Sequence, residues 1–432
     1  MLKSALKKII PPALLAEARR LKEGRPLADL HRDWRAAIGR AIPHEAARPT
    51  RRLLIVPSDA QTLIGALGDD AMISTAMSMG RAACPDVEID VLTATPRAQE
   101  AARALGLNPV SIWAGGDYVA RLFDHLSAAA YDAVLLLGAD VMDGYYSALT
   151  STKLIVTADL ASRFGARVAF LGFSFNDRPA AALKPFFDGV GPGVRFNVRD
   201  AISLSRFEAF TTARGRLVAD SAFLLQPATD DDKARATLDW IAAQKAQGRT
   251  VVGLNVHPML YASPRREDLD RMIAVSVAAL EGADPAIAWL VLPHDYRAER
   301  GDAAILRPIH DRLSDAVKAR TFYLEGTHSA AVLKAVAGAM DGVVAGRMHL
   351  AVASLGRGVP VLALTYQGKF DGLFRLAGLP EWLLLSPDQA FVEARLSQVL
   401  ARFLSELPAL KASVGAHLPD LRAASALNYD VL

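Results

Sequence analysis

Residues 341–371 read DGVVAGRMHLAVASLGRGVPVLALTYQGKFD. The first apolar run, GVVA, is followed at once by Arg347 and His349, and the second, VLAL, by a polar segment that contains Lys369. Apolar runs of this kind are typical of parallel strands buried on both faces, and ligands of such sheets bind beyond the carboxyl ends of the strands. The stretch therefore predicts an α/β fold with an anion-binding site at one sheet edge, and it indicates an enzyme.

The same alternation of apolar runs with helical segments continues through the chain. Two series of expected strands flank a linker-like stretch, SAFLLQPATDDD, which ends at Asp232. The alternation predicts two Rossmann-like, doubly wound parallel-sheet domains that face each other across a cleft. The expected strands are 53–56, 87–92, 110–113, 133–137, 168–171 and 194–198 in the first series, and 251–256, 289–292, 321–324, 342–345 and 361–364 in the second.

The predicted domain boundaries follow these series. They are a basic N-terminal leader at 1–48, a first Rossmann-like domain at 49–226, a second at 227–404 that carries the donor site, and a C-terminal helix at 405–432 that packs back on the first domain.

Composition excludes several classes of protein. The 432 residues are 52% hydrophobic, yet no apolar run approaches the roughly 18 to 20 residues that cross a bilayer, so we expect a cytoplasmic protein. Cys84 is the only cysteine, which excludes an internal disulfide and a cysteine-cluster zinc site. No GxGxxG after a strand, GxxxxGK[ST] or HExxH motif is present, and no metal or cofactor is expected.

Positive charge is concentrated at the start of the chain. Residues 1–52 hold 13 Lys and Arg against 5 Asp and Glu, although the net charge of the whole chain is only +3. Such a leader either is a solvated segment interrupted by Pro11-Pro12 or lies on an anionic membrane surface at the periphery. Without an aromatic-rich basic face or a known binding motif, no nucleic acid is expected as a partner.

Polar side chains follow the five expected strands of the second series. Parallel strands present their carboxyl ends at one edge, so these side chains should gather there. For His257 and His328 a surface role and a site role are evenly balanced, whereas Arg347 and His349 fit a site better because a helix N-terminus follows them. The residues at the strand ends are Asn255 and His257, His294 and Asp295, Glu325 and His328, Arg347 and His349, and Tyr366 and Lys369.

These residues resemble the signature of the polysaccharide pyruvyltransferases. The likeness is carried by Gly-Arg-Met-His at 346–349, the small-residue helix after it, Gly-Val-Pro at 358–360, and the segment from Tyr366 to Lys369. It extends over about residues 50 to 385, with a departure at Ala139, where a second glycine is expected. Further matching segments are GALGD at 65–69, 132–138, Val-Arg-Asp at 198–200 with Ser203, 220–223 and Leu-Pro-His at 292–294.

The resemblance implies a GT-B-like pair of domains and transfer of pyruvate from phosphoenolpyruvate to two hydroxyls of a sugar. The products would be a cyclic ketal and phosphate, and the acceptor would be a glycan. If this glycan is lipid-linked, the basic leader could hold the protein at the membrane. Phosphoenolpyruvate is then the donor substrate, with no other cofactor. Two alternatives stay open, namely a GT-B sugar-nucleotide glycosyltransferase and a catalytically silent glycan-binding scaffold.

Site roles follow from the chemistry that this reaction requires. Arginine grips phosphate and carboxylate bidentately, which favours Arg347 and Arg199 as donor ligands, with Lys369 adding charge. Histidine titrates near neutrality, which makes His349 the first acid/base candidate and His294 the second. The other candidate binding residues are Gly65, Gly68, Asp69, Glu325 and His328.

Several of these residues also have structural interpretations. Arg199 could form an ion pair with Asp200, and Asp69 could cap a helix. Gly65 and Gly68 could serve only a tight turn, and Lys369 could be a solvated flank of the next helix.

Overall fold

The computed structural model describes residues 12–229, 231–261, 265–296, 301–365, 368, 370–392 and 394–432. The chain divides into two compact units. The first unit holds the residues up to Ile64, Met72–Ser221 and Ala424–Leu432, and the second holds Gly65–Ala71 and Ala222–Ala423. Lys369 and Tyr366 lie outside the described residues.

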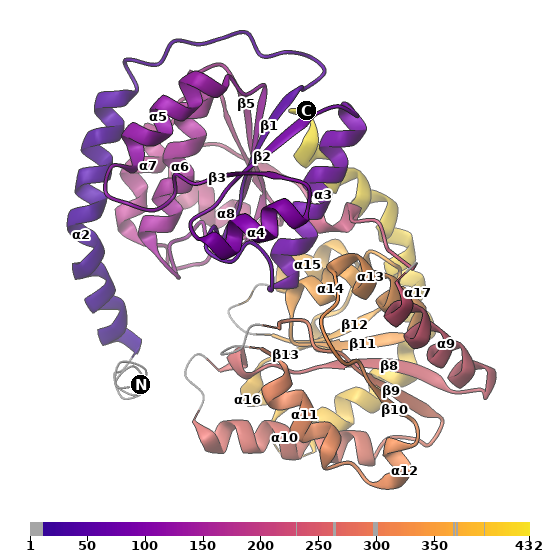
Figure 1. The fold of residues 1–432 in the computed structure, drawn as a ribbon. Coiled ribbons are helices and arrows are strands. Elements are labelled where there is room, and N and C mark those ends of the chain that lie inside the picture. The colour runs from indigo at the N-terminus through magenta and orange to yellow at the C-terminus, as the bar shows by residue number, and fades with distance from the viewer. Residues whose placement is uncertain are drawn as a thin grey trace. The chain divides into compact units, whose positions relative to one another are not determined.

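The first unit is built on a parallel sheet of seven strands in the order β3-β2-β1-β4-β5-β6-β7. This is the doubly wound order, in which the strand sequence reverses between β1 and β4. Figure 1 shows helices on both faces of the sheet. The strands are β1 (Arg52–Val56), β2 (Glu88–Leu92), β3 (Asn108–Val110), β4 (Ala133–Leu137), β5 (Arg167–Phe173), β6 (Val194–Val198) and β7 (Gly215–Leu217).

Local sequence fixes where several helices of the first unit begin. Thr95 caps α4 by accepting a hydrogen bond from the Ala98 N–H at 3.1 Å, and Pro96 occupies the first helical position, which its fixed φ suits. The helices are α2 (Pro12–Ala37), α3 (Leu67–Ala83, which begins in the second unit), α4 (Pro96–Ala104), α5 (Tyr118–Ala129), α6 (Ala148–Arg163), α7 (Lys184–Gly189) and α8 (Ala201–Phe210).

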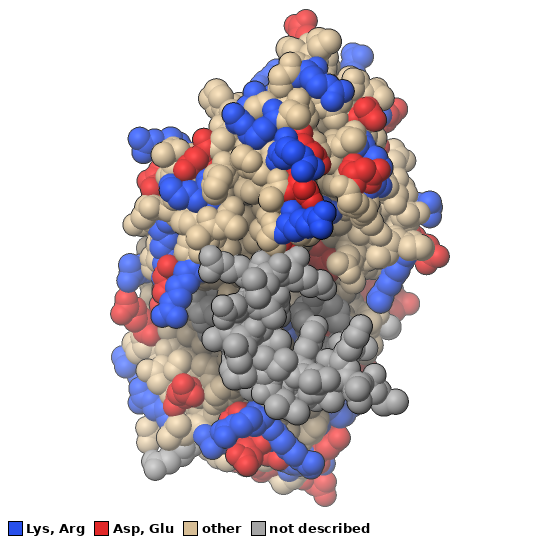
Figure 2. All heavy atoms as spheres, turned by 90° about the vertical axis from the view of Figure 1, so that its left-hand side faces the viewer, with Lys and Arg blue, Asp and Glu red and all other residues tan. Residues whose placement is uncertain are grey.

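Helix α2 packs on the first unit beside α5 and α6 (Figure 1). Leu27, Leu30 and Trp34 are buried, and the Trp34 indole N–H donates to Asp159 at 2.9 Å. The part of the predicted leader from residue 23 onward thus contributes apolar side chains to a core. Figure 2 shows Lys and Arg interleaved with Asp and Glu on the face of the molecule that carries α2.

The C-terminal residues also belong to the first unit. The Asn428 side chain accepts a hydrogen bond from the Gly172 N–H at 2.7 Å and donates to the Ala219 carbonyl at 2.9 Å. Asp430 forms ion pairs with Arg195 and Arg216, both at 2.5 Å. These contacts join the end of the chain to the strands of the first sheet.

The second unit contains a parallel sheet of six strands in the order β10-β9-β8-β11-β12-β13, with its reversal between β8 and β11. The strands are β8 (Thr250–Asn255), β9 (Ile287–Val291), β10 (Thr321–Tyr323), β11 (Gly342–Ala345), β12 (Val361–Leu364) and β13 (Leu384–Leu385). The main helices are α9 (Asp232–Ala246), α10 (Arg266–Glu281), α11 (Ala303–Asp311), α12 (Asp315–Lys318), α13 (Ala330–Ala339), α14 (Met348–Leu355), α15 (Phe370–Leu376), α16 (Pro387–Ala390) and α17 (Arg395–Ala426).

Within the described residues, no helix is both long and apolar enough to span a bilayer. Short 3-10 turns complete both units. These turns are η1 (Ala181–Leu183), η2 (Ser221–Leu224), η3 (Pro258–Leu260), η4 (Glu381–Leu383) and η5 (Leu427–Tyr429).

Candidate functional site

The carboxyl edge of the second sheet gathers polar residues around the reversal point between β8 and β11. Arg347 is the residue that precedes α14, and its guanidinium lies between two carboxylates. Its Nε and Nη2 donate to Asp302 at 3.0 and 2.6 Å, and its Nη1 is 3.2 Å from an oxygen of Asp295. The guanidinium is therefore held in one plane at the start of a helix.

Asp302 is the buried anchor of this arrangement, with no exposed surface. Besides Arg347 it accepts the Asn255 side-chain amide at 2.8 Å and the His294 backbone N–H at 2.9 Å. Burial raises the pKa of Asp302, while Arg347 and these hydrogen bonds oppose that rise. The orientation of Arg347 thus depends on a carboxylate that is fixed by two further strand ends.

His294 is buried beside this pair, with 4% of its surface exposed. Burial, followed by the nearby His349 and Arg347, lowers the pKa of the His294 imidazole to about 3. Its ring is accordingly neutral at physiological pH. A neutral imidazole offers one donor and one acceptor, so His294 can orient a neighbour or a substrate hydroxyl, but it is not a cationic acid.

His257 holds the backbone at Gly346, directly before Arg347 and His349. Its Nδ1 accepts a hydrogen bond from the Met259 N–H at 3.1 Å, so its Nε2 carries the proton and donates to the Gly346 carbonyl at 2.9 Å. Gly346 also donates its N–H to Asn255, at 2.9 Å. The ring is fully buried, which assigns His257 a positioning role.

The Gly65–Ala71 segment packs against this edge as part of the second unit. Ala66 forms an antiparallel bridge with Asp295, and the Asp70 carboxylate accepts the Ala330 N–H at 2.7 Å, at the start of α13. His349 reaches the same segment from α14. A Cβ atom placed on Gly68 would lie 2.6 Å from the His349 Cε1 and closer still to Nδ1, so the ring rests directly on the Gly68 backbone.

Replacing Gly68 with alanine should therefore disturb catalysis without removing a functional group. In a helix, Gly→Ala normally adds about 1 kcal/mol of stability, but here the new methyl would collide with the imidazole. We expect Gly68→Ala to lower turnover by about 10-fold or more, because a misplaced acid/base group loses its proton-transfer geometry. Steady-state kinetics would measure this.

The matched control is Gly415→Ala. Gly415 lies in α17, and apart from its chain neighbours and the nearby backbone of that helix, no atom of the described residues comes within 4 Å of the position that its new methyl group would take. This variant should leave turnover unchanged. In a His349→Ala background Gly68→Ala should have no further effect on turnover. Equal activities of Gly68→Ala and the wild type would show that the ring position is not constrained by this contact.

The remaining candidates of the second unit lie at the margin of this cluster. His328 is 8% exposed and its Nε2 is 2.9 Å from the Glu325 carbonyl, while the Glu325 carboxylate is exposed and paired with Arg307 at 2.6 Å. That hydrogen bond lowers the pKa of Glu325. Asp69 lies in the first turn of α3, and Gly65 has φ of +113°, a conformation that side chains other than glycine rarely adopt.

Arg199 belongs to the first unit and is buried there. It donates to Asp220 at 3.0 Å and to the Ser174 hydroxyl at 2.8 Å, and both charged side chains are almost fully buried. Asp200, the alternative partner, instead caps α8 by accepting the Ser203 N–H at 2.8 Å. Arg199 thus forms a buried ion pair within the first unit, and its partner is Asp220 rather than Asp200.

Sequence reasoning misses the most buried members of the site. Asp302 stands alone before an amphipathic helix, ten residues after the end of the expected strand 289–292, and no motif marks it. Asn255 and Asp295 are among the side chains expected to gather at the sheet edge, but the sequence alone gives neither of them a specific role. Asp70 looks like a cap of its own helix, whereas it accepts a hydrogen bond at the start of another.

The architecture and the site together define a two-domain parallel-sheet enzyme of the GT-B-like class. The model of the polysaccharide pyruvyl transferase family matches residues 67–368, which is most of the chain and includes the site residues from Gly68 to His349. The chain therefore belongs to the polysaccharide pyruvyl transferase family, and it is a transferase. A comparison with curated proteins finds no relative that matches.

Solved structures support the same fold. The UDP-GlcNAc 2-epimerase of Neisseria meningitidis, bound to UDP-GlcNAc, has a TM-score of 0.52 at 10% identity, covering 88% of this chain and 99% of its own. A glycosyltransferase of Rickettsia africae has a TM-score of 0.51 at 10% identity, covering 89% and 99%. The UDP-GlcNAc 2-epimerase of Methanocaldococcus jannaschii has a TM-score of 0.51 at 11% identity, covering 88% and 99%. Identities this low show the fold alone.

Proposed function

We propose that this protein transfers the three-carbon group of phosphoenolpyruvate to two hydroxyls of one sugar unit, forming a pyruvate ketal and releasing phosphate. The observation that carries the proposal is the packing of His349 on Gly68 next to the fixed Arg347, within the segment that matches the family model. This arrangement offers a titratable group and a cation at the start of a helix, where anions are favoured.

Atoms and protons balance in this reaction. The vinyl carbon of the donor gains one proton and becomes a methyl group, and its neighbouring carbon forms bonds to both sugar oxygens. The bond between that carbon and the phosphate oxygen breaks. One hydroxyl proton replaces the proton given to the vinyl carbon, and the other leaves with the phosphate.

We assign His349 to both proton transfers of the first addition. In its cationic form it would protonate the vinyl carbon, and the resulting neutral ring would accept the proton of the attacking hydroxyl, which restores the starting state. The buried neutral His294 would orient the ring or the hydroxyl. This division suits the two environments, because His349 is only partly buried whereas His294 is enclosed.

The donor is a trianion, and Arg347 alone cannot balance it, since Asp295 and Asp302 already lie against its guanidinium. Additional positive potential would come from the N-terminus of α14, from protonated His349 and from Lys369. In this proposal the two carboxylates set the plane in which Arg347 meets the donor, as fixed orientation is what bidentate recognition requires.

The acceptor would be a glycan. We include a lipid-linked oligosaccharide in the proposal because a basic N-terminal segment is attracted to an anionic membrane, where such an acceptor would lie. Peripheral contact with an anionic membrane surface would then involve residues 1–22 rather than the buried face of α2, which holds Leu27, Leu30 and Trp34. The reaction itself would take place in the cytoplasm, where phosphoenolpyruvate is available.

The proposal is tested with the purified full-length chain, phosphoenolpyruvate and a panel of p-nitrophenyl glycosides of galactose, glucose and mannose. We expect phosphate release that requires both the donor and a glycoside. Consumption of UDP-GlcNAc with no phosphate from phosphoenolpyruvate would favour a glycosyltransferase instead. Binding of glycosides with turnover of neither donor would favour a scaffold.

A further inference from the structure

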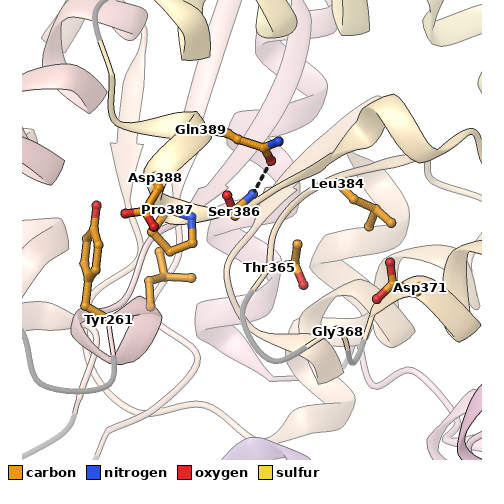
Figure 3. A pocket seen from close by; sticks show the side chains of 10 residues that line it. Tyr261, Thr365, Gly368, Asp371, Leu384, Ser386, Pro387, Asp388 and Gln389 are labelled. Carbon is orange, nitrogen blue, oxygen red and sulfur yellow. Dashed lines mark hydrogen bonds between the residues drawn. The ribbon is translucent and has the colours of Figure 1, made fainter. Parts of the chain in front are cut away.

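A second candidate site lies on the same sheet edge, in a cavity of about 460 Å³ that is open to solvent. Figure 3 shows side chains from three separate parts of the second unit around it. Its volume is in the range of pockets that hold a small ligand. The lining residues are Leu260, Tyr261, Thr365, Gly368, Asp371, Leu384, Ser386, Pro387, Asp388 and Gln389.

Strand register places this cavity beside the cation site. Ala345 of β11 pairs with Ala363 of β12, so Thr365 follows β12 at the same level at which Arg347 follows β11. Neighbouring strands are about 5 Å apart. The chain that leaves β8 also connects the two sites, because His257 lies at the first and Tyr261, four residues on, lines the second.

The chemistry of the cavity differs from that of the cation site. Among the described residues that line it there is no Lys or Arg, and two carboxylates, Asp371 and Asp388, are present. These two carboxylates disfavour a trianion beside them. A neutral ligand that donates hydrogen bonds would be accepted, since carboxylates are acceptors only.

The other polar groups complete a mixed set of donors and acceptors. The side-chain amide oxygen of Gln389 accepts a hydrogen bond from the Ser386 backbone N–H at 3.0 Å (Figure 3). The side-chain NH₂ group of Gln389 can therefore donate to a ligand. The Thr365 hydroxyl oxygen is buried and makes no hydrogen bond within the described part of the chain. A buried hydroxyl without a partner costs free energy, and a ligand hydroxyl at this wall would supply one.

Tyr261 adds an aromatic ring to one side of the cavity (Figure 3). Partial burial raises the pKa of its phenol, and the nearby Asp388 and Asp268 raise it further, so the hydroxyl stays protonated and can donate. An aromatic face beside hydrogen-bonding groups suits a pyranose ring, which has apolar C–H faces and a rim of hydroxyls.

We propose that this cavity binds a neutral sugar ring of the glycan acceptor, with Asp371 and Asp388 accepting hydrogen bonds from its hydroxyls and Tyr261 lying against its face. The inference rests on the proposed function, in which the acceptor must be held next to the donor. It assigns donor and acceptor to adjacent places on one sheet edge.

Binding is tested without turnover by saturation-transfer-difference NMR on the full-length chain, with the three p-nitrophenyl glycosides as probes. We expect at least one glycoside to bind the wild type. Asp388→Asn should raise its Kd about 10-fold or more, as the loss of a hydrogen bond to a charged group does, and Tyr261→Ala should raise it because the ring contact with the sugar face is lost. Tyr145→Ala and Asp420→Asn, at exposed positions on other elements, should leave the Kd unchanged. Melting curves would confirm that the variants are folded.

The kinetic experiment separates this inference from the proposed function. In an active enzyme the two cavity variants should raise the KM for the glycoside and change the KM for phosphoenolpyruvate by less than about 2-fold. Unchanged glycoside binding in both variants would overturn the inference even if pyruvyl transfer is observed. Binding of UDP-GlcNAc that the same variants abolish would also overturn it, because the cavity would then hold a nucleotide sugar.

Discussion

Replacing His349 with alanine should reduce kcat by a factor of about 10² to 10⁴, the usual contribution of a positioned general acid/base. The KM for phosphoenolpyruvate should change far less, because the cationic group at Arg347 and the helix N-terminus are retained. The side chain is partly buried at the start of α14, so we expect the variant to fold with a modest loss of stability. Phosphate-release kinetics and a thermal melt would measure both quantities.

His417→Ala is the matched control for this variant. His417 is also half-buried in the second unit and packs on a glycine, Gly378, in the same way, but it lies on α17. It should keep full activity. Added imidazole should restore part of the turnover of His349→Ala by entering the vacated space. Wild-type kcat in His349→Ala would remove this residue from the chemistry.

Replacing Arg347 with alanine should produce a large loss of stability in the second unit. The variant would leave Asp302 fully buried without its cation, and breaking a buried ion pair from one side costs about 3 to 5 kcal/mol. Phosphoenolpyruvate turnover should be lost as well. Urea denaturation followed by tryptophan fluorescence would measure the free energy of unfolding.

The double variant Arg347→Ala with Asp302→Asn distinguishes the two effects. Removing the buried charge should recover most of the lost stability, whereas turnover should stay absent because the donor ligand is still missing. Arg266→Ala, whose partner Asp270 is a solvent-exposed residue of the same helix, should cost less than about 1 kcal/mol. If the double variant is no more stable than Arg347→Ala, the unpaired charge of Asp302 is not the cause of the lost stability.

The fold could be predicted closely because its strands are short apolar runs. All eleven expected strands exist, and the doubly wound class is confirmed by two parallel sheets. The prediction is off for β3, expected at 110–113 but found at Asn108–Val110. It misses β7 and β13, which are edge strands of three and two residues whose pairing depends on a neighbour rather than on their own pattern.

The site could be predicted only where side chains leave strands. The exits of β8, β9 and β11 do meet, because parallel strands share one carboxyl edge. Nothing local in the sequence shows that Gly68 supports His349, since that contact joins positions 281 residues apart. Buried partners such as Asp302 and Asp220 are equally hidden, because an aspartate that neutralises an arginine looks like any surface aspartate in the sequence.

The most direct measurement is the NMR spectrum of the product formed in D₂O from phosphoenolpyruvate and the best glycoside. We expect a ketal methyl group that carries one deuterium, because the vinyl carbon is protonated by an exchangeable group. We expect His349→Ala to form this product about 10² to 10⁴ times more slowly. Transfer of a sugar from UDP-GlcNAc, with phosphoenolpyruvate recovered intact, would contradict pyruvyl transfer at this sheet edge.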